Sequence, residues 1–218
     1  MAKSFSSPAA SAILAQMNPL ITSALDALRS AGWTVELEPE PRPLPPAITE
    51  RYGAIPPLFA EFATHVRRCE RGDETVWILT ANDYSEPPNS DGFAWDSFET
   101  MMLEPGPGNG VADRFRTRSF WHRHLPILQS VFSDYEYLAI DTGSGAVVWA
   151  DVVDFDNPLQ IARDAADFFR QLAEVGAAEP TRSLVHRNSL ARFIHPEIVE
   201  DDATLSGWLA SLRSWFRR

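Results

Sequence analysis

Two histidines separated by one residue form the most ligand-like pattern in the chain. On an extended segment, His122 and His124 point to the same side, and this spacing can chelate a metal ion. However, Arg123 lies between them, three further arginines precede them, and no carboxylate follows until Asp134. Because a local positive field disfavours a divalent cation, we expect surface or packed histidines and no metal site.

Two further patterns resemble catalytic motifs only superficially. Gly143-Ser144-Gly145 has the letters of a nucleophile elbow, but we expect strands on both sides of it, whereas an elbow joins a strand to a helix. The single cysteine, Cys69, follows two arginines and precedes another, and these could lower the pKa of its thiol. A lone thiol that we expect near the surface carries no catalytic argument by itself.

Three carboxylates close together could do acid–base work or bind a cation. Asp151, Asp154 and Asp156 have this spacing, but no glycine stands where a calcium-binding loop needs one. Helix capping and solvation explain these acids without chemistry. The glycine-rich residues 106–110 lack the Lys-Ser or Lys-Thr of a phosphate-binding loop. No nucleophile, base and orienting group come together, so we expect neither an enzyme nor a cofactor.

Another segment mixes carboxylates with aromatic rings. Aromatic side chains are favoured anchors at protein interfaces, and carboxylates select basic partners. The predicted partner-binding residues are Asp83, Tyr84, Glu86, Asp91, Trp95, Asp96 and Glu99. Two plainer interpretations stay open: a solvated acidic loop, and a role for Trp95 and Phe98 as core residues of a short helix.

The charge distribution supports a basic protein partner. The formal net charge of the 218 residues is −11, which argues against non-specific nucleic-acid binding and against docking on anionic membranes. Residues 72–113 hold nine acids and no Lys or Arg, residues 114–133 hold four arginines and no acid, and residues 134–167 sum to −7. One cysteine excludes an intrachain disulfide, and we see neither a signal peptide nor an apolar run of membrane-spanning length. We therefore expect a cytoplasmic protein.

The apolar periodicity predicts the elements that position these residues. We expect helices over 19–31, 46–52, from 56 onward, over 93–103 and over 158–176, with Asn18 and Asn157 as N-caps. Strands are expected over 33–37, 75–80, 135–141 and 146–153, with a hairpin turn at 142–145. Residues 125–132 should form an edge or irregular strand, because Pro126 cannot donate to a ladder. Residues 204–218 should form an amphipathic helix, which either docks on its own domain or binds a partner or membrane surface.

The pattern predicts an α+β fold with a mostly antiparallel sheet flanked by helices and with helical additions at both ends. We divide the chain into an N-terminal helix with a proline-rich connector (1–43), a central domain (44–176) and a C-terminal extension (177–218). The connector holds Pro39, Pro41, Pro43, Pro45 and Pro46, which make it stiff.

An ordered set of short motifs in residues 44–175 resembles the SUKH superfamily, the domain of the Smi/Knr-type cell-wall-synthesis regulators and their bacterial relatives. The motifs are Leu44-Pro45, Tyr52-Gly53, the run from Ile55 to Phe62, the strand with Trp77, Leu125-Pro126-Ile127, the run from Ser133 to Asp141, and Gly145-Ala146-Val147-Val148.

The resemblance implies an α+β domain without catalytic residues, and its matched positions Trp77, Tyr135 and Gly145 look structural. Bacterial members are largely immunity proteins that bind and neutralise toxins, many of them nucleases. We therefore expect a non-catalytic binding protein whose partner is a protein toxin or another basic protein, because a nuclease presents a basic groove. The alternative is a regulatory scaffold that binds endogenous partners, as in the cell-wall-regulator relatives.

Overall fold

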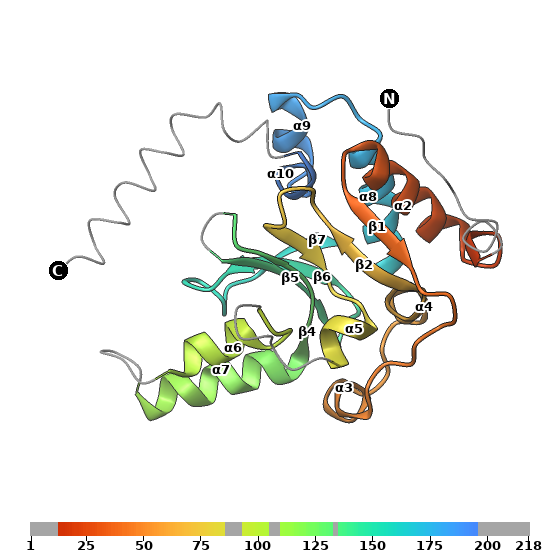
Figure 1. The fold of residues 1–218 in the computed structure, drawn as a ribbon. Helices are drawn as coiled ribbons and strands as arrows, with labels where there is room; N and C mark the ends of the chain where they lie inside the picture. The colour runs from red at the N-terminus through yellow and green to blue at the C-terminus, as the bar shows by residue number, and fades with distance from the viewer. Residues whose placement is uncertain (1–12, 86–92, 105–109, 133–134, 196–218) are drawn as a thin grey trace.

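The computed structural model describes residues 13–85, 93–104, 110–132 and 135–195, and within them seven antiparallel strands form one sheet. Strands that follow one another in the chain are also neighbours in the sheet, so the sheet is a meander (Figure 1). The strands are β1 (Thr34–Leu37), β2 (Val66–Glu70), β3 (Val76–Ile78), β4 (His124–Ser130), β5 (Glu136–Asp141), β6 (Val147–Asp151) and β7 (Leu159–Ala162).

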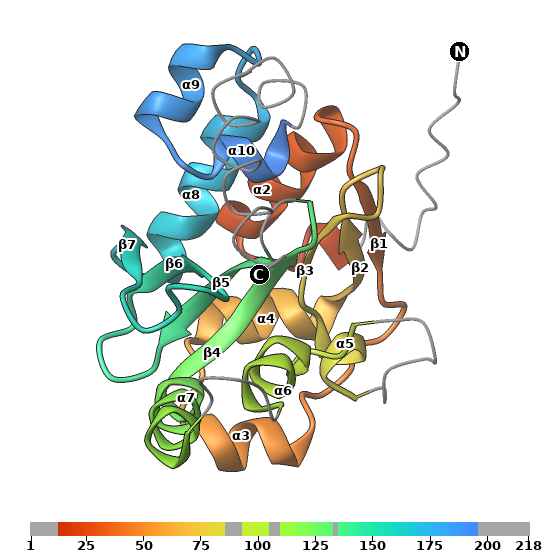
Figure 2. The same cartoon turned by 90° about the vertical axis from the view of Figure 1, so that its left-hand side faces the viewer.

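Helices cover both faces of this sheet (Figures 1 and 2). The described helices are α2 (Pro19–Ser30), α3 (Pro46–Tyr52), α4 (Pro57–His65), α5 (Ala81–Ser85), α6 (Ser97–Leu103), α7 (Val111–Arg123), α8 (Ala165–Gly176), α9 (Arg182–Arg187) and α10 (Ala191–Ile194). Helices α2, α4 and α8 share the larger core with one face, and α6 and α7 share a smaller core with the other. The predicted α+β class with an antiparallel sheet is confirmed.

Alternation along the central strands supplies both cores. In β5, Leu138 and Ile140 belong to the larger core, whereas Tyr137 and Ala139 belong to the smaller core. Successive side chains of a strand point to opposite faces, so a fully buried strand must be apolar on both. The burial of five of the six residues of β5 follows from helices lying on both sides.

Helix α2 forms as its caps predict. The Asn18 side chain accepts a hydrogen bond from the backbone N of Leu20 at 3.0 Å, and Pro19 occupies the first helical position. Gly32 follows the helix with a φ of +86°, a left-handed conformation that favours glycine. The predicted helix over 46–52 and the hairpin between β5 and β6 are also confirmed.

The prediction of an edge or irregular strand over residues 125–132 is wrong about the edge, but the irregularity is confirmed in β4. Strand β4 lies between β3 and β5, and all seven of its residues are buried. The proline is tolerated because the register with β5 shifts between Pro126 and Leu128, so the ladder is interrupted where the N–H is missing. The segment from Pro56 also differs, because its helix ends at His65 and Val66 starts a strand that we did not predict.

The predicted helix start near residue 158 was wrong. Leu159–Ala162 pairs with β6 as the edge strand β7, and the helix begins at Ala165. Its N-cap is Asp164, whose side chain accepts a hydrogen bond from the backbone N of Asp167 at 2.8 Å. Helix α7 was missed because it is rich in arginine and only Thr117, Phe120 and Trp121 are buried, which is too few for a clear apolar stripe.

The predicted boundary after residue 43 does not separate two cores in the described residues. Strand β1 pairs with β2 in the common sheet, and α2 packs on α8. The two helices approach so closely at Gly176 that an added Cβ would lie 2.9 Å from the carbonyl carbon of Ala27. Only glycine fits this contact, so the N-terminal helix is part of the main core.

Residues 177–195 are likewise part of the main core. Trp33 Nε1 donates to the carbonyl of Ile194 at 3.4 Å, and Arg71 Nη1 donates to the carbonyl of Phe193 at 3.1 Å. His195 Nε2 donates to the carbonyl of Val175 at 2.9 Å. These bonds attach α10 to the residues just before β1 and just after β2, and they attach His195, which follows α10, to α8. The helix predicted over 204–218 lies outside the described residues.

Candidate protein-binding surface

Of the seven predicted partner-binding residues, Glu86 and Asp91 lie outside the described residues. Asp83 lies in the first turn of α5, and its Oδ2 accepts from the backbone N of Thr80 at 2.6 Å and from the Thr80 hydroxyl at 2.8 Å. This is the acidic half of a capping box, in which the third helical residue bonds back to the N-cap. The carboxylate therefore has a structural function.

The two aromatic residues of the predicted set pack inside the fold. Tyr84 is buried, and its hydroxyl donates to the carbonyl of Pro126 at 2.5 Å. Burial raises the pKa of Tyr84 well above its ordinary value. Trp95 is partly buried, with ring centroids 6.1 Å from Tyr84 and 6.3 Å from Tyr52. The prediction that Tyr84 anchors a partner is corrected, because its ring and its hydroxyl are both engaged.

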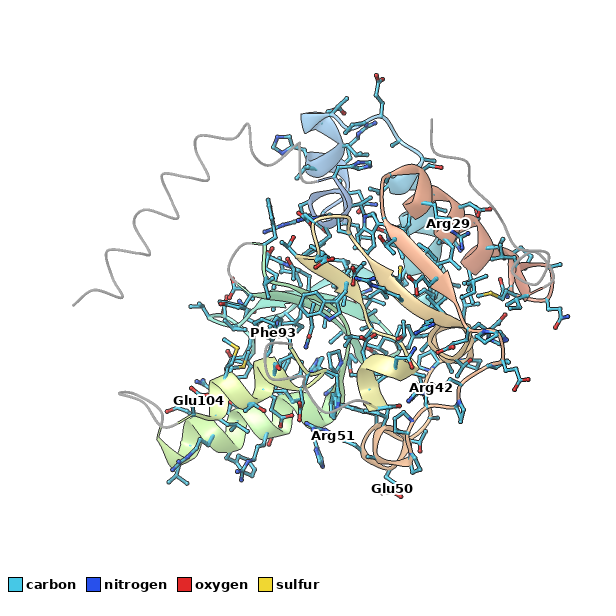
Figure 3. All side chains as sticks on the ribbon, viewed as in Figure 1. Arg29, Arg42, Glu50, Arg51, Phe93 and Glu104 are labelled. Carbon is cyan, nitrogen blue, oxygen red and sulfur yellow. The ribbon has the colours of Figure 1, made fainter. Side chains whose placement is uncertain are left out.

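Glu99 is engaged in an ion pair. Its Oε2 lies 2.6 Å from Nη2 of Arg51, and both side chains are largely shielded from solvent. The same guanidinium lies over the rings of Tyr52 and Trp95, 5.2 and 5.4 Å from their centroids. Arg51 therefore connects α3 to α6, and Figure 3 shows it beside α3 at the base of the fold.

Asp96 is the remaining described member of the predicted set. It precedes α6, and its carbonyl accepts from the backbone N of Thr100 at 2.9 Å, but its side chain makes no capping hydrogen bond. It is partly exposed. Asp83 and Glu99 thus make structural contacts through their carboxylates, whereas the Asp96 carboxylate does not cap its helix.

A different group of aromatic rings lies at the surface, and we call it the aromatic patch. It consists of Trp77, Phe93, Phe98 and Tyr135. The Phe93 centroid lies 6.0 Å from Trp77, 6.0 Å from Phe98 and 5.9 Å from Tyr135. Phe98 is fully buried, whereas Phe93 and Tyr135 are exposed. The patch is therefore held by one ring in the smaller core and presents two rings to solvent; Figure 3 labels Phe93 above α6.

The backbone of the patch holds one strained residue. Tyr135 has a φ of +55°, which costs a residue other than glycine about 1–2 kcal/mol. Strained residues of this kind cluster at functional sites. The sequence indicated Trp77 and Tyr135 only as structural positions. Alternation along β3 could have indicated Trp77, which is only partly buried between the fully buried Val76 and Ile78, although it also packs against the larger core.

The two histidines do not form a metal site. Helix α7 ends at Arg123, so His122 is exposed on the last helical turn while His124 is buried at the start of β4. His124 Nδ1 donates to the carbonyl of Phe120 at 2.9 Å, and burial lowers the pKa of its ring. No three His, Cys, Asp or Glu side chains in the described part of the chain are placed to hold a metal ion.

The other chemically suggestive residues also have structural functions. Cys69 is buried in β2, and this burial raises the pKa of its thiol, which corrects the suggestion of an activated surface cysteine. Asp151 Oδ1 accepts from the backbone N of Val153 at 2.8 Å and of Asp154 at 2.7 Å, forming a turn. Asp156 does not precede a helix, since β7 follows it, and it pairs instead with Arg116.

No protein-family model matches this chain, and comparisons with curated proteins and with solved structures found no match. The resemblance to the SUKH superfamily therefore stays a prediction. Among the described residues, no helix has the length and apolar character needed to cross a membrane.

Proposed function

We propose that this chain is a non-catalytic protein-binding module, an immunity protein that neutralises a bacterial toxin in the cytoplasm by direct contact. The observation that carries the proposal is the aromatic patch, in which Phe93 and Tyr135 are exposed over the buried ring of Phe98. Exposed aromatic rings on a rigid support are typical of interface hot spots. The immunity function itself rests on the resemblance to the SUKH superfamily.

Charge supports a basic partner. Three of the four rings of the patch belong to residues 72–113, the stretch that holds nine acids and no Lys or Arg. A carboxylate-rich surround accelerates association with a basic protein and makes the association rate sensitive to salt. A nuclease toxin, with its basic substrate groove, has the required chemistry. The partner is a protein and neither a nucleic acid nor a membrane, given the net charge of −11.

The test is co-expression with the protein encoded by the neighbouring gene, with growth rescue and binding affinity as readouts. We expect Phe93→Ser and Tyr135→Ser each to weaken binding by about tenfold or more, because anchors cost more than about 1 kcal/mol when truncated. Phe115→Ser is the matched control, since Phe115 is even more exposed but lies away from the patch on α7.

A double variant tests the charge argument. Glu86→Lys combined with Asp91→Lys should lower the association rate and flatten its salt dependence, while leaving the dissociation rate nearly unchanged. Asp83 is left in place because it caps α5. If Phe93→Ser and Tyr135→Ser bind as tightly as the wild type, the patch is not the interface. Capture of several endogenous proteins, without one tight stoichiometric partner, would favour the regulatory scaffold.

A further inference from the structure

The last described helix, α10, is fixed close to the aromatic patch. The guanidinium of Arg192 on α10 pairs with the carboxylate of Glu136, which directly follows Tyr135 of the patch. The carbonyl of Phe193 accepts from Arg71, in the turn between β2 and β3, and Figure 1 shows α10 beside that turn. Helix α10 is therefore held at the end of the sheet where β3 and β5 begin.

The aromatic patch lies at the same end of the sheet. Trp77 is the second residue of β3, and Tyr135 immediately precedes β5. In the register of the sheet, Val76 pairs with Ser130, and Ser130 pairs with Glu136. The residue that binds α10 is therefore in the row of the sheet next to that of Trp77, and the described chain ends near the patch.

Residues 196–218 continue the chain from this point, and the sequence predicts an amphipathic helix over 204–218. Helix α10 packs on the larger core, whereas Phe98 holds the patch from the smaller core, so the chain must pass round the end of the sheet to reach the patch. Residues 196–203 can span about 26 Å when extended. This length exceeds two layer spacings of roughly 10 Å each.

The predicted helix over 204–218 has an apolar side and a basic charge. Its charged residues are Arg213, Arg217 and Arg218, and it contains no acid. The patch presents aromatic rings, three of them from residues 72–113, which hold nine acids and no Lys or Arg. Aromatic pairs and opposite charges both favour contact between the two. The apolar side consists of Leu205, Trp208, Leu209, Leu212, Trp215 and Phe216.

We propose that residues 204–218 dock as a helix on the aromatic patch of the same chain and cover Phe93 and Tyr135. A helix of this length is marginal in water by itself, so burial of its apolar side stabilises it. The short connection from α10 keeps its effective concentration at the patch high. The docking does not depend on the identity of a partner. Its consequence rests on the proposed function: the toxin and the helix compete for the same rings.

Other exposed apolar side chains of the described residues fit this helix less well. Phe115 lies on α7 near Arg114 and Arg118, which have no ion-pair partner in the part of the chain that the structure describes, so they repel a basic helix. Val153 follows β6 at the same end of the sheet as the patch, but it exposes one aliphatic side chain and no group of rings. Phe115 and Val153 therefore serve as controls.

Hydrogen exchange of the full chain, read by mass spectrometry, tests the docking. The backbone amides of residues 204–218 should exchange more slowly than in a synthetic peptide of the same residues, because the docked helix must open first. Phe93→Ser and Tyr135→Ser should each accelerate this exchange by about tenfold or more, the usual effect of truncating an anchoring ring. Phe115→Ser and Val153→Ser, which also truncate exposed apolar side chains, should leave it unchanged.

Variants of the segment itself give the reciprocal test. Trp208→Ser combined with Trp215→Ser removes both indole rings and should accelerate exchange in residues 93–98 as well as in 204–218. Ala210→Gln combined with Ser214→Gln changes the polar side of the predicted helix and should have no such effect. Thermal melts followed by circular dichroism identify any variant that fails to fold.

Dilution distinguishes docking within one chain from docking on a second copy. Protection of residues 204–218 should not change with protein concentration, and the sedimenting mass should stay at 24.3 kDa. Protection that falls on dilution would overturn the proposal, because the segment would then bind another copy. Exchange of the wild-type segment at the rate of the free peptide would overturn it too. So would protection that Val153→Ser or Phe115→Ser removes and the two patch variants leave intact.

The competition is tested separately with the toxin. Trp208→Ser combined with Trp215→Ser should raise the apparent affinity by about tenfold if the patch is free one tenth of the time, because the apparent affinity scales with that fraction. A chain that protects residues 204–218 but binds no toxin would support the docking and refute the proposed function. Toxin affinity that stays unchanged when exchange shows the segment released would refute the competition.

Discussion

A buried ion pair between Glu136 and Arg192 connects the segment after α8 to the sheet, and its contribution to stability can be tested. Glu136, at the start of β5, is almost fully buried, and its carboxylate pairs with Nη2 of Arg192 on α10. The same carboxylate accepts from Nε1 of Trp149 at 3.2 Å, and the guanidinium lies 5.1 Å from the Trp149 ring centroid. The three side chains therefore form one contact between the sheet and the segment that follows α8.

The perturbation is Arg192→Met, which keeps an unbranched side chain but removes the charge. Removing one partner of a fully buried pair costs about 3–5 kcal/mol, because the other charge is left without compensation. Since 27% of the Arg192 side chain is exposed and water can reach the pair, we expect a loss of about 2–3 kcal/mol at neutral pH. For a domain of this size, that loss lowers the melting temperature by about 4–12 °C.

The loss should depend on pH with a definite sign. Burial raises the pKa of Glu136 above the reference value of 4.5, and the charge of Arg192 opposes that rise. Without Arg192 the pKa rises further, so the folded variant binds a proton that the unfolded chain releases. Stability of the variant relative to the wild type then falls as the pH rises through the range above 4.5. The cost of Arg192→Met should be large at neutral pH and small in acid.

Urea unfolding of both proteins at neutral and at acidic pH measures this difference, and the comparison at each pH cancels the titration of the other carboxylates. Adding Glu136→Gln to Arg192→Met should restore most of the stability at neutral pH, because the amide carries no charge and can still accept from Trp149. Arg170→Met, which breaks the exposed pair with Asp167, should cost at most about 0.5 kcal/mol. An equal loss at both pH values, or no rescue by Glu136→Gln, would refute the electrostatic reasoning and leave packing on Trp149 as the cause.

Two further predictions concern the larger core. Gly176→Ala should destabilise the protein by about 1–3 kcal/mol in urea unfolding, because its Cβ would lie 2.9 Å from the carbonyl carbon of Ala27. Unchanged stability would mean that α2 and α8 do not pack this closely. The thiol of Cys69 should resist a thiol-specific reagent at neutral pH in the native state and react after unfolding, because burial shields it and raises its pKa. Rapid reaction of the native protein would contradict its position in β2.

Secondary structure was predicted correctly where all the local sequence features indicate the same element. Asn18 followed by Pro19 and an apolar stripe predicts α2 because cap, first turn and buried face all agree. The hairpin of β5 and β6 follows from two apolar runs around Gly143 and Gly145, the latter with a φ of +79°. The overall class was predictable for the same reason.

Local signals failed where two patterns competed. Asn157, Pro158 and Gln160 form an acceptable helix start, but Leu159–Ala162 can also complete the ladder with β6, and the sheet edge supplies more hydrogen bonds than an early helical turn. Asp164 then provides a second N-cap for a shorter helix. Which cap is used depends on the position of β6, and that position is not encoded in the neighbouring residues.

The candidate surface was harder to predict because exposure is a tertiary property. Tyr84 looks like an interface residue in its acidic segment, yet its hydroxyl bonds to the carbonyl of Pro126, 42 residues away. Tyr135 resembles a strand residue in the sequence. In the structure it has a positive φ, and its ring lies beside the ring of Phe93 in the aromatic patch. Composition singled out residues 72–113 but did not indicate which of their aromatic rings would face solvent.

The exposed apolar residues of the described chain are distributed unevenly between the two sides of the sheet. None lies on α2, α4 or α8, which cover the larger core. They lie on or beside the layer of α6 and α7, or on the strands and turn next to it: Phe93, Met101, Val111, Phe115, Tyr135, Val153 and Leu159. The first side is closed by helix packing and by the contacts of α10, so it stabilises the fold. The second side holds the aromatic patch, so the proposed partner would bind there on the side away from α2, α4 and α8.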